Sequence, residues 1–235
     1  MTEANASAVD GCDVSVVVPT YGGAAGLAQL HVRISQALGL LGITWELVLV
    51  DDASPDDTPV VARQITQADP RVRYMRLPRN QGQHRATVIG MAHARGRSVV
   101  TMDDDLQQAP ESIPTLLAAL RDDTDVVIAR FSVSAHPGWR RAGSWLVNAF
   151  MTTSRRTQPL GITSFKAFRA EAGQKVLAAV PREGSFYLAR VLLQVVPRSR
   201  IVNVDVPHYA RSHGRSGYRP RDLLGLAWRA LRSRG

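Results

Sequence analysis

The segment SVVTMDDDLQ, residues 98–107, joins a short apolar run to three consecutive carboxylates and a carboxamide. The apolar run predicts a buried strand, and the acidic residues follow where that strand leaves its sheet. Asp103, Asp105 and Gln107 offer oxygen atoms at alternate positions, which suits Mg²⁺ or Mn²⁺ holding a substrate phosphate. The simpler interpretation is a solvated acidic turn ahead of a helix at Pro110, and the rest of the chain weighs against it.

Strand-like and helix-like segments alternate on both sides of this segment. β-branched runs predict strands over 13–18, 45–50, 72–77 and 125–129, the first of them stopped by Pro19. Helices are expected up to about 39, over 57–68, from a turn at 80–83 to about 95, and over 110–120. This order is typical of an α/β fold, a Rossmann-like and mostly parallel sheet flanked by helices.

Polar residues follow several of the predicted strands. Ligands of such sheets bind outside the carboxyl ends of the strands. The residues at those ends are Pro19 and Tyr21, Asp51 and Asp52, the Asp103 group, and Arg130. The sequence therefore predicts one binding rim that carries both carboxylates and a guanidinium.

The second half of the chain is less regular. Helices are expected over 138–156, 170–180 and 184–195, and strands over 162–169 and 200–206. After Pro220 a helical wheel puts Leu223, Leu224, Ala227, Trp228 and Leu231 on one side and Arg221, Arg229 and Arg232 on the other. Such a basic amphipathic helix suits a membrane interface or an apolar groove on a partner, and it equally suits packing on its own domain.

Composition narrows the class of protein. Of the net charge of +9 on 235 residues, +7 falls within 196–235, which holds nine Arg and two Asp, and this predicts an anionic partner. The single Cys12 suits a reducing compartment. Residues 1–11 have no apolar core of a signal peptide, and no stretch of 18 apolar residues occurs. We expect a cytoplasmic protein, with peripheral contact at the inner face of the membrane as one option.

Four motif segments, at 14–21, 48–54, 80–90 and 102–107, are similar to those of family 2 nucleotide-sugar glycosyltransferases, whose fold is called GT-A. The chain most resembles their polyprenyl-phosphate branch, the dolichol-phosphate mannose synthases and bacterial undecaprenyl-phosphate sugar transferases. That branch typically shows DADLQ, an SGFRAF-like strand and RxxGxSKY. This chain has DDDLQ at 103–107, TSFKAF at 163–168 and RSHGRSGY at 211–218. The resemblance covers roughly 13–219.

The resemblance implies a role for each matching position. Contacts with the nucleotide donor would come from Pro19, Tyr21, Asp51, Asp52, Asp103 and Asp104, and the metal on the donor diphosphate would be held by Asp103, Asp105 and Gln107. The catalytic candidates are Asp105 and three cations around the acceptor phosphate and leaving diphosphate, Arg130, Lys166 and Arg211. A loop closing over the site would include His213, Gly214, Ser216 and Tyr218. The other histidines lack metal-ligand spacing, and His84, His93, His136 and His208 are interpreted as surface or capping residues.

The chain departs from the family pattern at several positions. Gly22 and Gly23 stand where relatives usually carry Asn-Glu, so a donor-site acid is lost. Lys166 replaces the usual Arg, which keeps the charge but not the bidentate geometry. Gly217 replaces a Lys of the loop, and Arg219 is the nearest compensating cation.

The acceptor class is predicted from a missing base. Many relatives that glycosylate hydroxyl groups carry an Asp base in a Glu-Asp pair, whereas Glu183 is followed here by Gly184. A lipid phosphate is already a nucleophile at neutral pH and needs only orientation and charge balance. We therefore expect a metal-dependent inverting enzyme that moves a hexose from a UDP- or GDP-sugar to a polyprenyl phosphate, with Mg²⁺ or Mn²⁺ as cofactor.

Two alternatives stay open. A soluble relative would glycosylate a small-molecule hydroxyl, with Glu183 or another carboxylate as base. A nucleic-acid-binding module would explain the basic tail but not the acidic strand ends. For the enzyme we expect a flexible N-terminus at 1–12 and a GT-A catalytic domain at 13–219, followed by the tail helix at 220–235. Within that domain, 13–131 would be the nucleotide-sugar half and 132–219 the acceptor half.

Overall fold

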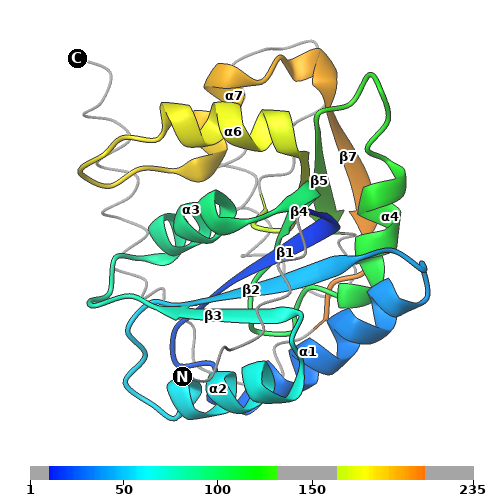
Figure 1. The fold of residues 1–235 in the computed structure, drawn as a ribbon. Helices are drawn as coiled ribbons and strands as arrows, with labels where there is room; N and C mark the ends of the chain where they lie inside the picture. Colours follow the sequence, from blue (N-terminus) through cyan, green and yellow to red (C-terminus); the bar gives the residue numbers. More distant parts are fainter. Residues whose placement is uncertain (1–10, 132–162, 210–235) are drawn as a thin grey trace, which may run out of the picture.

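A computed structural model of the chain describes residues 11–131 and 163–209. Within these residues seven strands form one mixed sheet in the order β3-β2-β1-β4-β6-β5-β7 (Figure 1). The predicted α/β class is confirmed. The strands are β1 Cys12–Thr20, β2 Trp45–Asp51, β3 Val72–Arg76, β4 Gly96–Thr101, β5 Val126–Phe131, β6 Lys166–Arg169 and β7 Ile201–Val206.

One strand of the described sheet runs against the others. β1, β2, β3 and β4 pair in parallel, as do β5 and β7, while β6 is antiparallel to both β4 and β5. The first residue of β6, Lys166, therefore lies opposite Thr101, the last residue of β4. An antiparallel strand thus brings its beginning, with a lysine, to the edge where the parallel strands end.

Helices cover both faces of the sheet. In Figure 1, α3, α6 and α7 lie on one face, and α1, α2 and α4 lie on the other. The helix bounds are α1 Ala24–Gly39, α2 Thr58–Ala68, α3 Gln83–His93, α4 Ile113–Ala118, α6 Ala170–Ala179 and α7 Leu188–Val195, with short 3₁₀ turns at Pro110–Ser112 and Arg198–Arg200.

Each face of the sheet has its own apolar core. Val16 and Leu47 belong to the core under α1, whereas their chain neighbours Val17 and Val48 belong to the core under α3. Successive residues of a strand point to opposite faces, so a strand covered on both faces must be apolar throughout. This explains the unbroken apolar runs of β1 and β2, and with them why the sequence predicts these strands well.

β1 extends past the point at which the sequence predicts its end. It continues through Pro19 to Thr20, with Pro19 opposite Val50 of β2. The pairing of β1 with β4 already ends at Val17. The backbone of Pro19, like that of Val17 two residues earlier, is directed toward the β4 side, where the pairing has ended. Its missing N–H therefore removes no hydrogen bond from the sheet.

Three further elements are shorter than predicted. The segment expected to be a strand over 162–169 forms β6 only from Lys166, and the helix expected from 184 begins at Leu188. The helix expected over 110–120 is a 3₁₀ turn followed by α4, which ends at Ala118. The helix predicted at 138–156 and the tail at 220–235 lie outside the described residues.

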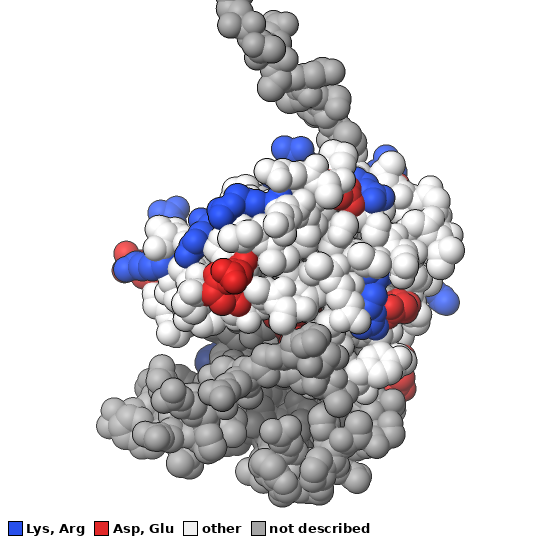
Figure 2. Space-filling model, turned by 90° about the horizontal axis from the view of Figure 1, so that it is seen from below, with Lys and Arg blue, Asp and Glu red and all other residues white. Residues whose placement is uncertain are grey.

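The described surface carries mixed charge. Figure 2, a view from below, shows Lys and Arg side chains close to Asp and Glu side chains among uncharged residues. On this face the charges are therefore mixed rather than of one sign. None of the described helices combines the length and hydropathy needed to cross a membrane.

Asp69, between α2 and β3, supports a stability prediction. Its buried carboxylate accepts hydrogen bonds from the side chain and N–H of Arg71 and lies 2.9 Å from His31 Nε2. These bonds, those from Arg71 first, hold the pKa of Asp69 far below its usual range. Asp69→Asn should therefore lower the free energy of unfolding at pH 7 by about 1–2 kcal/mol.

The sign of the pH dependence follows from the lowered pKa. The stabilisation by Asp69 is complete above the carboxyl's unfolded pKa of about 4 and is lost as the pH falls toward the folded value. Urea unfolding should therefore show the wild type and Asp69→Asn converging below pH 4. Asp122→Asn is the control, because that carboxylate is fully exposed and its pair with Arg169 should contribute little. Equal stability of wild type and Asp69→Asn at pH 7 would contradict the assignment.

Candidate active site

The turn after β4 is fixed by its own side chains. Met102 adds one bond to β1, its N–H donating to the Val17 carbonyl. Gln108 closes the turn, because its Oε1 accepts from the N–H of Asp103 at 3.0 Å and its Nε2 donates to Asp103 Oδ2 at 2.9 Å. Leu106 is buried with a φ of 59°, an unusual backbone conformation for leucine. The carboxylates that follow β4 are thus held on a defined turn.

Asp103 is the most heavily hydrogen-bonded of the three acids. Its Oδ1 accepts from the Gln83 side chain of α3, and its Oδ2 accepts from Ser164 Oγ at 2.5 Å as well as from Gln108. Burial, followed by the charge of Asp105, raises the pKa of Asp103, while the bond from Ser164 opposes the shift. The carboxylate therefore joins α3, the turn after β4 and the segment before β6.

Asp104 points toward the start of α1. Its Oδ2 accepts a 2.5 Å hydrogen bond from Thr20 Oγ1 at the end of β1. A Cβ atom at Gly23 would overlap this same carboxylate oxygen. Burial raises the pKa of Asp104 to about 6, with further increases from Asp103 and Asp105. The glycine that replaces a family acid thus leaves the space that Asp104 fills.

Asp105 and Gln107 lie further along the turn and are half-buried. Asp105 Oδ1 accepts from the N–H of Gln107 at 3.1 Å. Within 11–131 and 163–209, no three His, Cys, Asp or Glu side chains come together as a set that could hold a metal ion. A metal bound at this turn would therefore need other ligands in addition to its carboxylates.

Lys166 is a cation buried at the edge of the sheet. It is 3% exposed, and its Nζ donates to the carbonyl of Thr163. Burial lowers the pKa of Lys166 to about 8, against the opposing effect of the Asp103 carboxylate. The carbonyl that it contacts belongs to the irregular segment before β6, where Thr101 Oγ1 also donates to the Ser164 carbonyl at 2.6 Å.

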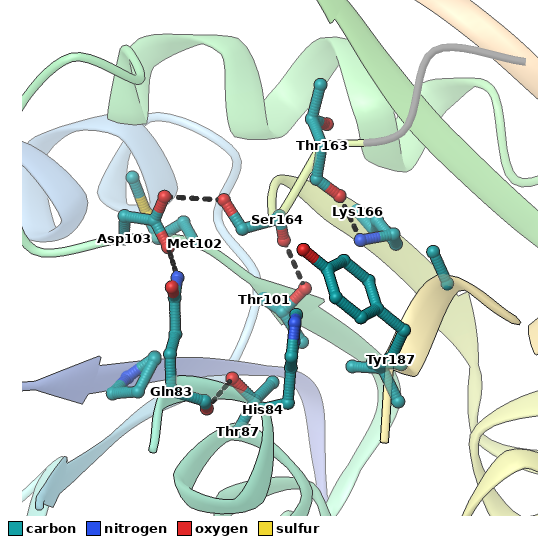
Figure 3. A pocket seen from close by; sticks show the side chains of 13 residues that line it. Gln83, His84, Thr87, Thr101, Met102, Asp103, Thr163, Ser164, Lys166 and Tyr187 are labelled. Atoms are coloured by element: carbon teal, nitrogen blue, oxygen red, sulfur yellow. Dashed lines mark hydrogen bonds between the residues drawn. The ribbon is translucent and has the colours of Figure 1, made fainter. Parts of the chain in front are cut away.

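Asp103 and Lys166 border one cavity of about 180 Å³ at the carboxyl edge of the sheet (Figure 3). It lies between the start of α3, the end of β4, the segment before β6 and the start of α7. The cavity is lined by Pro19, Gln83, His84, Thr87, Thr101, Met102, Asp103, Thr163, Ser164, Lys166, Tyr187, Leu188 and Ala189. An anionic group and a cationic group therefore face the same small space.

Asp51 and Asp52 are both buried and hydrogen-bonded within the protein. Asp51 accepts from the N–H of Ser54 at 2.7 Å and from Tyr74 Oη at 2.8 Å. Burial, followed by this hydrogen bond, raises the pKa of Tyr74 to about 12. Asp51 thereby ties β2 to β3.

Asp52 holds the turn that opens α3. Its two oxygens accept from the N–H groups of Gln81 and Gly82, each at 2.7 Å. Since α3 begins at the next residue, Gln83, this carboxylate fixes the helix end that faces the cavity. In this structure Asp52 therefore acts on the cavity through the backbone of the turn.

The other predicted site residues are spread more widely. Pro19 lines the cavity, whereas Tyr21 is exposed just beyond β1. Arg130, at the end of β5, forms a two-point ion pair with Asp205 of β7 at 2.6 and 2.8 Å and does not line the cavity. Arg211, His213, Gly214, Ser216 and Tyr218 lie outside the described residues.

Among the cavity residues that the sequence interpretation does not assign to the site are Gln83, Ser164 and His84. His84 was interpreted as a surface or capping residue, yet it is half-buried and lines the cavity. All three lie within motifs that the family resemblance rests on, at 80–90 and 163–168. Their position in those motifs was the available signal. What the sequence lacked was the antiparallel β6, which brings the two motifs together.

The comparisons with known proteins agree with this architecture. Residues 15–175 match the family model for glycosyl transferase family 2, so the chain belongs to that family. It is 34% identical over 218 residues to the undecaprenyl-phosphate 4-deoxy-4-formamido-L-arabinose transferase of Edwardsiella ictaluri, covering 92% of this chain and 66% of that protein. It is 33% identical over 224 residues to the dodecaprenyl-phosphate galacturonate synthase of Rhizobium johnstonii, covering 89% and 63%. The chain thus spans about two thirds of the length of these relatives.

Solved structures show the same GT-A fold at lower identity. One is the glucosyl-3-phosphoglycerate synthase of Mycobacterium tuberculosis, crystallised with Mn²⁺, UDP-glucose and phosphoglyceric acid. It aligns with a TM-score of 0.66 and 22% identity, covering 95% of this chain and 79% of that one. Another is a mannosyltransferase of Pyrobaculum calidifontis with GDP-mannose and Mn²⁺, at a TM-score of 0.60 and 19% identity, covering 96% and 62%.

Proposed function

We propose that this chain transfers a hexose from a UDP- or GDP-sugar to a polyprenyl phosphate, with inversion at the anomeric carbon. The main support is the cavity in which the Asp103 carboxylate and the buried Lys166 ammonium face the same space. A buried ammonium is costly unless it is paired, and the hydrogen bond of Lys166 goes to a neutral carbonyl. The phosphate groups of both substrates would supply the anion. The names of the two relatives above support a polyprenyl phosphate as acceptor.

A divalent metal, Mg²⁺ or Mn²⁺, fits the acidic turn. The turn offers hard carboxylate oxygens from Asp103 and Asp105, with Gln107 beside them. Mg²⁺ in nucleotide sites is usually held by one or two carboxylates together with substrate phosphates, so a third protein carboxylate is not required. When bound, the metal would neutralise negative charge on the donor diphosphate.

The reaction needs no proton transfer. An oxygen of the acceptor phosphate forms a bond to the anomeric carbon while the bond from that carbon to the diphosphate oxygen breaks, and the electron pair leaves with the nucleoside diphosphate. Lys166 would stabilise the anionic oxygens from its buried position, where a charge acts more strongly than in water. Asp52 and Gln108 would keep the two sides of the cavity in place through the hydrogen bonds described above.

Other proposed roles fall on residues outside the described ranges. Arg211 would complete the cationic cluster with Lys166, and His213, Gly214, Ser216 and Tyr218 would form the acceptor loop, within a catalytic domain spanning 13–219. Arg130 is left out of that cluster, because its guanidinium pairs with Asp205 and does not line the cavity. The tail at 220–235 would make the peripheral membrane contact that a lipid acceptor requires, since its pattern is apolar on one side and basic on the other.

Glu183 gives no support to the hydroxyl-acceptor alternative. A hydroxyl acceptor needs a general base within hydrogen-bond reach of the proton. Glu183 is exposed in the segment before α7 and does not line the cavity. The phosphate acceptor is therefore the better match to the described residues.

The proposal predicts release of nucleoside diphosphate that depends on a lipid phosphate. The full chain would be incubated with Mn²⁺ or Mg²⁺ and UDP-glucose, UDP-N-acetylglucosamine or GDP-mannose, with a short polyprenyl phosphate or its matched polyprenol. We expect release only with the phosphate and a loss of release when EDTA removes the metal. Equal release with the polyprenol, or turnover that survives EDTA, would contradict the corresponding part of the proposal.

A further inference from the structure

His84 is a half-buried imidazole whose Nε2 has unused hydrogen-bonding capacity. It lies in the first turn of α3, next to Gln83, and lines the same cavity as Lys166. Its Nε2 is shielded from solvent and has no hydrogen-bond partner among the described residues. Buried polar atoms are nearly always paired, so an unpaired ring nitrogen beside a cavity indicates a missing ligand atom.

The ring of His84 is held by aromatic neighbours. Its centroid is 4.7 Å from that of Tyr187 and 6.4 Å from that of Phe186, both in tilted arrangements. Figure 3 shows the imidazole beside the Tyr187 ring, on the cavity side that also holds Thr101. Packing of this kind fixes the direction of the ring nitrogens, which is what a binding group requires.

The chemistry of the ligand follows from the charges around the cavity. Burial, then the charge of Lys166, lowers the pKa of His84, so the ring is neutral at pH 7 and carries one N–H. An ammonium has three donors, and the described structure uses one of those on Lys166. Asp103, on the same cavity, already accepts hydrogen bonds from three side chains. The two unused ammonium hydrogens of Lys166 are donors, and His84 Nε2 is a third in the tautomer that carries its proton there. Together they suit a tetrahedral oxyanion.

We propose that the Nε2–H of His84 and the Nζ of Lys166 together bind the phosphate group of the acceptor. This inference rests on the proposed function and adds a second, neutral donor to the acceptor site. Two donors from different elements, α3 and β6, fix both the position and the rotation of a phosphate, whereas a single lysine acts as a point charge. His84 is thus a substrate-binding residue that orients the attacking oxygen.

Two substitutions at His84 separate hydrogen bonding from packing. His84→Phe keeps a ring against Tyr187 and removes the donor, and His84→Gln restores an N–H near the place of Nε2. We expect His84→Phe to raise the KM for farnesyl phosphate about tenfold, the usual effect of losing one hydrogen bond to a charged group. His84→Gln should recover most of that loss. The dissociation constant of the nucleotide donor should stay within about twofold in both variants, as should all constants in His93→Phe, an exposed position on α3.

A binding experiment keeps this inference separate from the proposed function. Calorimetry would measure binding of farnesyl phosphate, glycerol phosphate and inorganic phosphate to the full chain and to His84→Phe. If no phosphate compound supports transfer but binding to the wild type is weakened in His84→Phe, the proposed function fails and the subsite stands. A preference for farnesyl phosphate over the two soluble phosphates assigns the site to lipid. Absence of binding to the wild type, an unchanged KM in His84→Phe, or equal loss of donor affinity would overturn the subsite.

Discussion

Replacing Lys166 with methionine should lower kcat for lipid-dependent nucleotide release by about 100- to 1000-fold, the usual cost of losing one group that stabilises transition-state charge. The reason is position rather than charge alone, because this ammonium is 3% exposed and borders the cavity together with Asp103. Nucleotide release at saturating acceptor and donor is the measurement.

The fold of the Lys166→Met variant should be preserved. Methionine is unbranched and close to lysine in length, and it avoids the cost of burying an ammonium whose described hydrogen bond goes to a neutral carbonyl. Thermal unfolding should therefore show a midpoint equal to or above that of the wild type. The matched control is Lys175→Met on α6, an exposed lysine that should leave both kcat and the unfolding midpoint unchanged. A kcat near the wild-type value would remove Lys166 from the proposed chemistry.

Asp105→Ala should abolish metal-dependent turnover, with a loss of about 1000-fold or more in kcat, because the proposed metal would lose one of its two carboxylates. The substitution should be mild for folding, since Asp105 is half-buried on a turn that Gln108 also closes. Nucleotide release measured over a range of Mn²⁺ concentrations would distinguish weakened metal binding from loss of chemistry.

The control for Asp105→Ala is Asp123→Ala, an exposed acid in the loop before β5. It changes the net charge of the chain by the same amount without touching the turn after β4. Circular dichroism of both variants should match the wild type. If Asp105→Ala keeps full activity at limiting Mn²⁺, the assignment of the metal to this turn is wrong.

The parallel part of the sheet could be predicted because its strands are covered on both faces. The apolar runs before Asp51 and Asp103 reflect that burial directly, and each ends at the acid that follows it. β6 was harder to predict, since its four residues are set by pairing with β4 and β5 on either side. The residues just before β6 are predicted as strand but are irregular. The carbonyls of Thr163 and Ser164 there accept hydrogen bonds from side chains.

The site divides in the same way. That Asp103 and Lys166 belong to one site followed from the family motifs, and in the structure they border one cavity. Arg130 is predicted to belong to the same site, but in the structure it pairs with Asp205, which lies opposite it in the pairing of β5 with β7. His84 is harder to assign from sequence, because a lone histidine at a helix start has no ligand spacing; its place beside the cavity is seen from its packing against Tyr187.

The contact between Gly23 and Asp104 links the history of two positions that are far apart in the chain. Any side chain at position 23 meets the Asp104 carboxylate and the Thr20 hydroxyl, so a lineage that gains the family acid there has to move or replace these side chains. Loss of the acid at 104 is itself unfavourable, because it leaves the buried Thr20 hydroxyl without its acceptor. The two positions are therefore epistatic. The two compatible combinations are glycine at 23 with an acid at 104, and an acid at 23 with alanine at 104. Homologues with acids at both positions, or with glycine at 23 and alanine at 104, should be rarer.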